Sequence, residues 1–251
     1  MITKEELEEY KKIRGFKNLG LAEKDYFQNI ILFIISQNFG KTLIFKGGTA
    51  LNKCYGLPRF SEDLDFNAES KIELKIIEEN LKKFNIDFEI ESKDYSDETK
   101  AVIRIKGPLY IGIKNSMCSI ILDISLREKT VLSPKIKTIG RFLNEIPSFD
   151  ILIMDEEEVL AEKVRAVFSR DKARDVYDLN FLLEKNIRIN KELINNKLKY
   201  YNLEFNIKSF EKKINQKKEI WNTELKSLID KMPDFNEVKK KIIDDICNLM
   251  K

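Results

Sequence analysis

The spacing of apolar and polar residues predicts a first part of mixed helices and strands and a helical second part. Apolar residues recur at helical spacing over residues 22–38, which is typical of a long helix with a buried face. Three later runs have the alternation or apolar character of strands: 87–92, 101–106 and 119–125. From residue 155 onward the spacing is helical. We therefore expect an α+β lobe over 1–150 and a helical lobe over 151–251, joined through the polar segment 127–150.

Residues 42–66, TLIFKGGTALNKCYGLPRFSEDLDF, contain the clearest candidate for a binding site. The apolar run before Gly47 predicts a buried strand, and the residues from Thr49 onward favour a helix. A diglycine turn at the start of a helix lets the backbone approach a ligand closely, and the helix amides suit a phosphate. We therefore predict a phosphate-binding turn at Gly47, Gly48 and Thr49.

Three carboxylates are candidates for a metal site. In the sequence DLDF, Asp63 and Asp65 alternate with apolar residues, so both acids point to one face of a predicted strand and repel each other unless a cation intervenes. Asp123 interrupts the apolar run SIILDIS, and a buried carboxylate without a partner costs about 3–5 kcal/mol. Oxygen ligands of this kind suit Mg²⁺. The alternative for Asp123 is a salt bridge with a lysine or arginine of the core.

Charged residues also fall on helical stripes that are otherwise apolar. Lys163 belongs to the inward series of DEEEVLAEKVRAVFSR, so it should meet a negative group, either the acids or a triphosphate. In RDVYDLNFLLEK, Asp175 and Asp178 extend the apolar series backwards. For Asp175 the alternative is capping of the helix N-terminus. For Asp178 it is a salt bridge with Arg174 or Lys163.

The composition narrows the chemistry. The 251 residues include no histidine, which excludes histidine general bases, Ser-His-Asp triads and histidine-ligated zinc. The three cysteines are scattered, as is typical of reduced thiols in a cytoplasmic protein. The longest apolar run is too short to cross a bilayer, and the N-terminus is too polar for a signal peptide. We therefore expect a cytoplasmic protein that does not bind membranes.

The two motifs resemble those of the polymerase-β-like nucleotidyltransferases, which carry Gly-Gly or Gly-Ser, a spacer and then Asp-x-Asp. More closely, KGGTALNKCYGLPRFSEDLDF is similar to the AbiEii/AbiGii-type nucleotidyltransferase toxins, and RDVYDLNFLL resembles a later motif of that family. The resemblance covers roughly residues 45–183. It implies a polymerase-β-like lobe with a mixed sheet, followed by a helical lobe that completes the active-site cleft.

The resemblance also implies a reaction and roles for the candidate residues. A nucleoside monophosphate passes from an NTP to an acceptor hydroxyl, and pyrophosphate is released. The divalent ions, Mg²⁺ or Mn²⁺, are bound by three acids: Asp63, Asp65 and Asp123. Lys163 contacts phosphate, and Asp175 orients or deprotonates the acceptor. Arg59 and Ser61 flank the acids and either contact the nucleotide or serve the loop.

The implied biological role is that of a toxin in a toxin–antitoxin or phage-defence pair. The acceptor would be the 3′ end of tRNA or a protein, and the antitoxin a winged-helix protein. Neither the base of the NTP nor the acceptor follows from this sequence alone.

Two other functions remain open. An aspartate-nucleophile phosphatase would use Asp63, but such a residue normally ends an apolar strand, whereas PRFSE precedes it here. A non-catalytic RNA-binding module would use the lysine-rich residues 208–218, with Tyr200, Tyr201 and Trp221 stacking on bases. A lysine-rich surface that simply faces solvent explains the same pattern.

Overall fold

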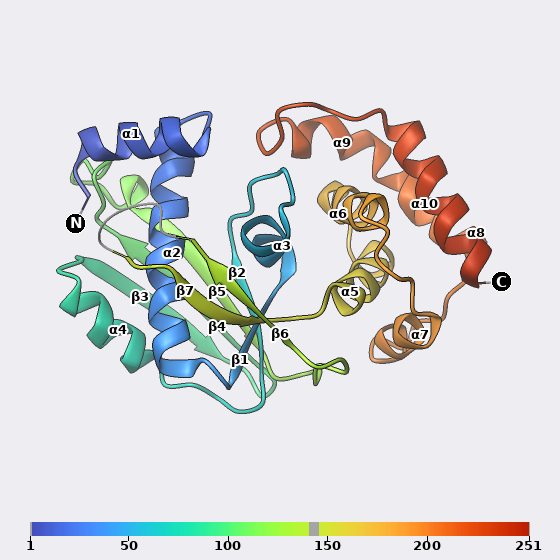
Figure 1. Ribbon diagram of the computed structural model, residues 1–251, viewed down its shortest axis with the longest axis horizontal. Helices are drawn as coiled ribbons and strands as arrows, with labels where there is room; N and C mark the ends of the chain where they lie inside the picture. The colour runs from blue at the N-terminus through green and yellow to red at the C-terminus, as the bar shows by residue number, and fades with distance from the viewer. Residues whose placement is uncertain (1, 141–145, 251) are drawn as a thin grey trace. The chain divides into compact units, whose positions relative to one another are not determined.

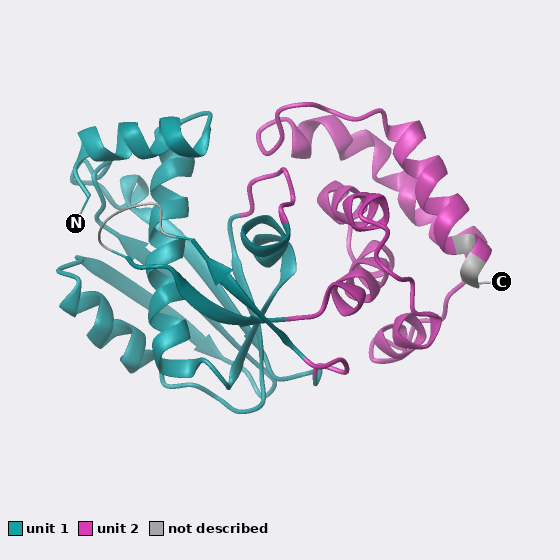
Figure 2. Cartoon of the chain, viewed as in Figure 1, with its two compact units in different colours: residues 1–55, 62–129, 134–153 teal, residues 56–61, 130–133, 154–251 magenta. Residues whose placement is uncertain are grey.

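The computed structural model describes residues 2–140 and 146–250, and the chain divides into two compact units (Figure 2). Unit 1 comprises residues 1–55, 62–129 and 134–153. Unit 2 comprises residues 56–61, 130–133 and 154–251. The helical unit therefore includes two short segments from earlier in the chain.

Unit 1 contains a mixed sheet with seven strands within the described residues (Figure 1). In chain order these are β1 (Leu43–Lys46), β2 (Leu64–Ala68), β3 (Phe88–Asp94), β4 (Glu98–Ile105), β5 (Cys118–Ser125), β6 (Lys135–Ile139) and β7 (Phe149–Ile153). Their order across the sheet is β3-β4-β5-β2-β1-β7-β6. Neighbours are antiparallel except for the parallel pairs β2–β5 and β1–β7. The predicted α+β class with a mixed sheet is confirmed.

Helices pack on this sheet and complete the core of unit 1. They are α1 (Lys4–Arg14), α2 (Leu19–Phe39), α3 (Gly47–Tyr55), α4 (Leu74–Lys83) and the short 3₁₀ helix η1 (Lys114–Ser116). Helix α2 contacts β5, β7 and α4, and its Phe27 and Ile31 are completely buried (Figure 1). It begins earlier than predicted because the Asn18 side chain caps it by accepting a hydrogen bond from the Leu21 N–H.

The segment 127–150 is more than the polar connection that its sequence predicts. It contains β6, which pairs antiparallel with β7 at the edge of the sheet. Of the five residues of β6, only Ile139 is buried, so the strand carries too little apolar alternation to be recognised. Residues 141–145, which belong to the same predicted connection, lie outside the described residues.

Unit 2 is built from helices. They are α5 (Glu156–Ser169), α6 (Ala173–Glu184), α7 (Lys191–Lys199), α8 (Ile207–Gln216), α9 (Lys218–Leu225) and α10 (Phe235–Met250). Helices α5 and α6 form its centre, because α5 contacts α6, α7 and α8, and α6 also contacts α9 and α10. Across residues 2–140 and 146–250, no helix has the length and apolar character needed to cross a membrane.

The two early segments of unit 2 are held by specific hydrogen bonds. The buried Glu158 carboxylate accepts bonds of 2.8–3.0 Å from the backbone N–H groups of Val131 and Leu132, and Lys197 pairs with it at 2.8 Å. In the segment 56–61, the Phe60 N–H donates to the Leu228 carbonyl at 3.0 Å. These contacts explain why both segments belong to the helical unit.

Candidate active site

Asp65 and Asp123 lie side by side on neighbouring strands of unit 1. In the parallel pair β2–β5 they occupy the same register position, and both residues are half-buried. The same row continues on both sides, with Lys46 of β1 opposite Asp65 and Lys100 of β4 opposite Asp123. Residues opposite each other in neighbouring strands point to the same face. The two carboxylates therefore lie in one row across the sheet with a lysine on each side.

The acid pair carries unfavourable repulsion. Burial raises the pKa of the Asp123 carboxyl to about 6, and the negative charges of Asp65 and Glu98 add to this effect. Lys100 opposes it, because its Nζ lies 3.6 Å from Asp123 Oδ2 and 2.6 Å from Glu98 Oε1. A further cation at this position would therefore stabilise the ionised pair.

The diglycine turn is fitted closely to these acids. Gly47 has a positive φ of 74°, and a Cβ at this position would collide with Asp65 Oδ2. Thr49, which is completely buried, donates a hydrogen bond of 2.5 Å from its Oγ1 to the Asp63 carbonyl oxygen. The turn is thus attached to the residue that precedes β2. The Thr49 hydroxyl donates its proton to the protein backbone and not to a ligand.

The carboxylates of Asp65 and Asp123 are oxygen donors of the kind that suits a divalent metal. Asp63 immediately precedes β2, which begins at Leu64, so it lies outside the strand on which the sequence placed both acids, and strand alternation does not fix the direction of its side chain. In the part of the chain that the structure describes, no three acidic or thiol side chains are already arranged to hold a metal ion. Mg²⁺ commonly takes one or two carboxylates and completes its octahedron with substrate phosphates and water. Asp65 and Asp123 suit that mode of binding better than a preformed cage.

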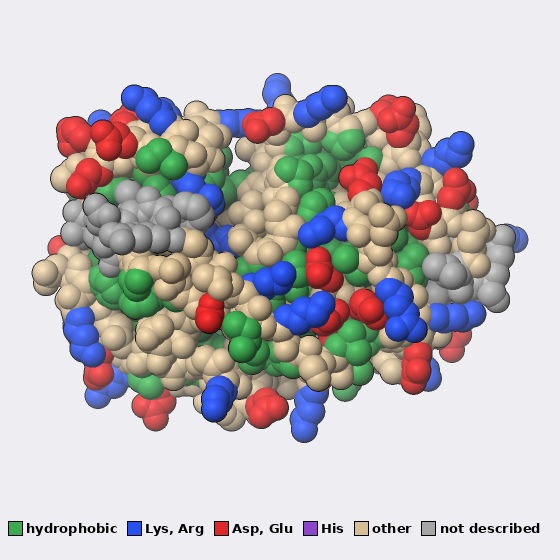
Figure 3. All heavy atoms as spheres, in the orientation of Figure 1, with side chains coloured by type: hydrophobic (Ala, Val, Ile, Leu, Met, Phe, Trp, Pro, Cys, Tyr) green, Lys and Arg blue, Asp and Glu red, His purple; other side chains and the backbone are tan. Residues whose placement is uncertain are grey.

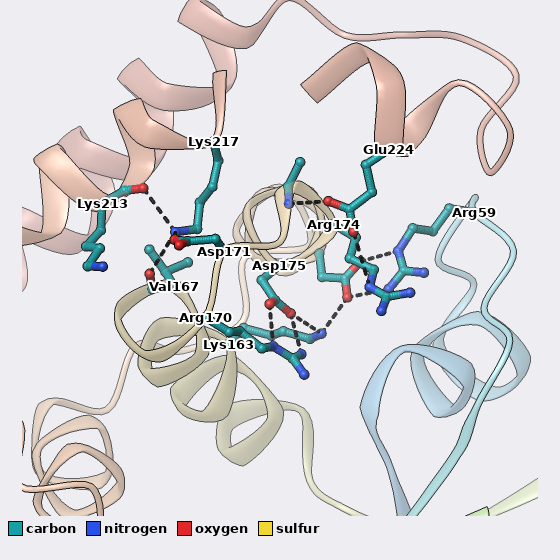
Figure 4. A network of polar contacts seen from close by, with 12 residues as sticks. Arg59, Lys163, Val167, Arg170, Asp171, Arg174, Asp175, Lys213, Lys217 and Glu224 are labelled. Carbon is teal, nitrogen blue, oxygen red and sulfur yellow. Dashed lines mark hydrogen bonds and ion pairs between the residues drawn. The ribbon is translucent and has the colours of Figure 1, made fainter. Parts of the chain in front are cut away.

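The charged residues predicted on the inward faces of unit 2 meet one another in an ion cluster (Figure 4). We define it by five residues: Arg59, Lys163, Arg170, Asp175 and Asp178. Lys163 Nζ lies 3.0 Å from Asp175 Oδ1 and 2.7 Å from Asp178 Oδ2. Arg170 binds both oxygens of Asp175 at 2.7 Å. Arg59 binds both oxygens of Asp178 at 2.6 and 2.7 Å.

The cluster keeps both of its acids ionised. Burial disfavours the charge of Asp175, but Lys163 and Arg170 outweigh it and hold the pKa of this carboxyl below its ordinary value. For Asp178, Arg59 and Lys163 likewise outweigh burial and lower the pKa. Asp175 could accept a proton from an acceptor only by leaving both cations. In this arrangement it orients Lys163 and Arg170.

The alternatives left open by the sequence are partly resolved here. Lys172 occupies the N-cap position of α6 without a side-chain capping hydrogen bond, and Asp175 lies within the helix, so Asp175 is not its N-cap. The Asp178–Lys163 salt bridge is present, whereas Arg174 pairs with Glu224 at 3.5 Å.

The segment 56–61 supplies a structural arginine. The three donor groups of the Arg59 guanidinium bind Asp178 and the Phe60 carbonyl oxygen, and the side chain is almost fully buried. Ser61 is also buried. For Arg59 the structure therefore supports the loop role over contact with a nucleotide.

Two members of the predicted lysine-rich stacking surface, Lys217 and Trp221, are buried, whereas Tyr200, Lys208 and Lys212 are exposed. Lys217 is completely buried and donates to the carbonyl oxygens of Val167 and Lys213. Trp221 is a core residue whose Nε1 donates to the Pro233 carbonyl at 3.1 Å. On the face shown in Figure 3, cationic and anionic side chains are interspersed. Trp221 is thus excluded as a stacking platform for bases.

Sequence reasoning missed Glu98, Lys100 and Arg170. The first two belong to β4, which starts three residues before the predicted strand at 101–106. The outward series Glu98, Lys100, Val102 was the available signal, because it continues the alternation of VIRIK toward the N-terminus. Arg170 follows the last helical residue of α5, where periodicity gives no prediction.

Comparison with known proteins identifies the family. The sequence model of the AbiEii nucleotidyl transferase toxins, which belong to type IV toxin–antitoxin systems, matches residues 30–242. The chain belongs to the AbiEii nucleotidyltransferase toxin family. This confirms the predicted family and enzyme class. A search among curated proteins finds no match.

Solved structures agree with the fold of this AbiEii chain. JHP933 from Helicobacter pylori is 22% identical and has a TM-score of 0.64, with 94% of each chain covered. MenT4, a nucleotidyltransferase toxin from Mycobacterium tuberculosis, is 19% identical and has a TM-score of 0.68, covering 98% of this chain and 90% of its own. At these identities the likeness extends to the fold alone.

Proposed function

We propose that this AbiEii toxin transfers a nucleoside monophosphate from an NTP to an acceptor hydroxyl and releases pyrophosphate. The first candidate acceptor is RNA, in particular the 3′ end of tRNA, and a protein is the second. The observation that carries the proposal is the pairing of Asp65 with Asp123 on two parallel strands beside the glycine turn. A further positive charge would stabilise such a pair, and a metal–nucleotide complex supplies one.

The acids would hold Mg²⁺ or Mn²⁺. Asp65 and Asp123 are the central ligands, and Asp63 joins them from two residues earlier in the chain. When bound, the metal would activate the attacking hydroxyl and neutralise charge on the departing pyrophosphate. The raised pKa of Asp123 is consistent with this assignment, because burial and, after it, the negative charges of Asp65 and Glu98 disfavour the ionised form that a divalent ion would stabilise.

The turn of unit 1 and the ion cluster of unit 2 are each proposed to contact phosphate. Gly47 and Gly48 lie at the start of α3, where backbone N–H groups and the positive end of the helix dipole would favour a phosphate. The Thr49 hydrogen bond to the Asp63 carbonyl holds the turn and the acids at a fixed separation. Three cations and two acids give the ion cluster a net charge of +1, and the half-exposed Arg170 presents it to solvent. Lys163 would contact phosphate while Asp175 and Asp178 orient it.

The family also points to a protein partner. Type IV toxin–antitoxin membership suggests a cognate antitoxin. We assign it to the winged-helix class and the pair to phage defence, on the resemblance of the toxin motifs alone.

A labelling experiment tests the reaction. The purified chain is incubated with each NTP labelled at the α-phosphate, Mg²⁺ and total tRNA, and compared with Asp65→Asn. Asp87→Asn is the matched control, because Asp87 is exposed and lies outside the acid row. Label on tRNA that Asp65→Asn abolishes and Asp87→Asn keeps supports the proposal. Label on protein would identify a protein, the second candidate, as the acceptor. Release of phosphate without nucleotide transfer contradicts the proposal and favours a phosphatase.

A further inference from the structure

Lys100 stands at the edge of the acid pair without binding it directly. Its Nζ is 3.6 Å from Asp123 Oδ2, which is too long for a hydrogen bond but close enough for a strong charge interaction. The same ammonium lies 2.6 Å from Glu98 Oε1. Lys100 therefore forms its short ion pair with Glu98, and its interaction with Asp123 is a longer-range charge attraction.

Glu98 is well placed to restrain this lysine. Its carboxylate is mostly buried, and its second oxygen accepts a hydrogen bond of 2.5 Å from Arg127 Nη2. Arg127 is itself held by Asp97 at 2.7 Å. Two cations therefore fix the Glu98 carboxylate, and Lys100, whose side chain is half exposed, is the mobile member of the group.

The positions of Lys100 and the two acids across the sheet show how the lysine can affect metal binding. Asp65, Asp123 and Lys100 occupy one register level on β2, β5 and β4. In the absence of a metal, the ion pair with Lys100 places a positive charge beside Asp123. Any divalent ion that bound the acid pair would be repelled by the same ammonium.

We propose that Lys100 is the counter-ion that holds Asp123 before a divalent metal binds, and that Glu98 keeps the Lys100 ammonium off the carboxylate oxygens. Metal and lysine then compete for the charge of the acid pair, while the oxygens stay open to the metal. Lys100 and Glu98 are positioning residues, since they act through Asp123. The inference rests on the proposed metal site. As a consequence, the site should bind the metal ion alone weakly and the metal–nucleotide complex more tightly. The phosphates of the nucleotide add negative charge, which offsets the repulsion between the metal and Lys100.

Removing each partner should change metal affinity in opposite directions. Lys100→Met removes the competing charge, so the chain should bind Mn²⁺ about three- to tenfold more tightly than the wild type. Glu98→Gln releases Lys100 onto Asp123 and removes a negative charge, so binding should weaken by a similar factor. Lys100→Arg should stay near the wild type. If the Lys100–Glu98 bridge had a purely structural role, Lys100→Met and Glu98→Gln would change the Mn²⁺ affinity in the same direction.

Electron paramagnetic resonance of Mn²⁺ gives a readout that does not depend on activity. The full chain is titrated with MnCl₂, alone and with a mixture of four non-hydrolysable NTP analogues. Lys93→Met is the matched control, because Lys93 lies opposite Lys100 one strand farther from Asp123 and should change affinity less than twofold. Thermal unfolding of each variant in metal-free buffer verifies that it is folded.

The outcomes separate this inference from the proposed function. Tighter Mn²⁺ binding by Lys100→Met together with weaker binding by Glu98→Gln supports the inference. If Asp123→Asn abolishes Mn²⁺ binding while Lys100→Met leaves it unchanged or weaker, the inference is wrong and the metal site stands. If no variant binds Mn²⁺ with or without the nucleotide analogues, the proposed metal site is wrong and the inference falls with it.

Discussion

Gly47 and Asp65 are in direct contact, and a side chain at position 47 has no room beside the carboxylate. Gly47 has a φ of 74°, and an added Cβ would collide with Asp65 Oδ2. Gly47→Ala should therefore displace Asp65 and lower the rate of nucleotidyl transfer by at least about 100-fold, since small misplacements of reacting groups are costly. Backbone strain should also cost about 1–3 kcal/mol of stability. Transfer assays and denaturant unfolding on one preparation measure both effects.

Gly112→Ala is the control for backbone strain. Gly112 also has a positive φ, 89°, but nothing lies within 4 Å of an added Cβ. This variant should lose comparable stability and keep its activity. Equal loss of activity in the two variants would rule out the Asp65 contact as the cause.

Thr49 offers a test of how the turn positions the acids. Thr49→Val keeps the shape of the side chain but removes the hydrogen bond that Thr49 donates to the part-buried Asp63 carbonyl. We expect a loss of about 1–3 kcal/mol in stability and about tenfold in kcat. Thr49→Ser retains the hydroxyl and should restore most of the rate. Failure of serine to restore it would mean that the methyl group, and not the hydrogen bond, matters.

The ionised Asp123 carboxylate should lower the free energy of unfolding at neutral pH. Its pKa is raised from 3.8 to about 6, so between these values the folded chain holds a proton that the unfolded chain has released. Stability therefore falls as pH rises through this window. In metal-free buffer, Asp123→Asn should increase stability by about 1–3 kcal/mol at pH 8 and by less at pH 5. In a separate assay with Mg²⁺ the same variant should not catalyse transfer. Unfolding curves at both pH values measure this, and a loss of stability at pH 8 would contradict it.

The ion cluster of unit 2 should be sensitive to loss of one acid. Asp178→Ala leaves Arg59 without its carboxylate partner and Lys163 with one fewer, and both cations are buried. We expect a loss of about 3–5 kcal/mol of unfolding free energy, measured in urea. The matched control is Asp245→Ala, which breaks the surface pair with Lys241 and should cost at most about 1 kcal/mol. Similar costs in the two variants would show that burial does not strengthen the cluster.

The sequence was sufficient for features that depend on local periodicity. Alternation in DLDF correctly placed the Asp65 carboxylate opposite the buried faces of Leu64 and Phe66. The interruption of an apolar stripe likewise marked Lys163 and Asp178 as inward-facing, and their salt bridge was among the stated alternatives. The motif also gave the correct family, because a diglycine turn and paired acids are rarely combined by chance.

Features that depend on strand pairing were beyond the sequence. Asp65 and Asp123 are neighbours only because β2 and β5 are parallel and in that register, and nothing in either strand alone specifies the pairing. Lys100 could not be assigned to the site for the same reason. Trp221 was misinterpreted because an aromatic residue near lysines fits a stacking surface and a buried core equally well in sequence.

The contribution of Arg59 to the helical unit limits how this toxin can be divided. A fragment that starts at residue 154 would carry Lys163 and Asp178 but lack the guanidinium that binds both oxygens of Asp178. A split version, made to switch the toxin on by joining two pieces inside a cell, should therefore not be cut at residue 153. A cut that leaves residues 56–61 on the same piece as α5 and α6 would preserve the helical half before reassembly.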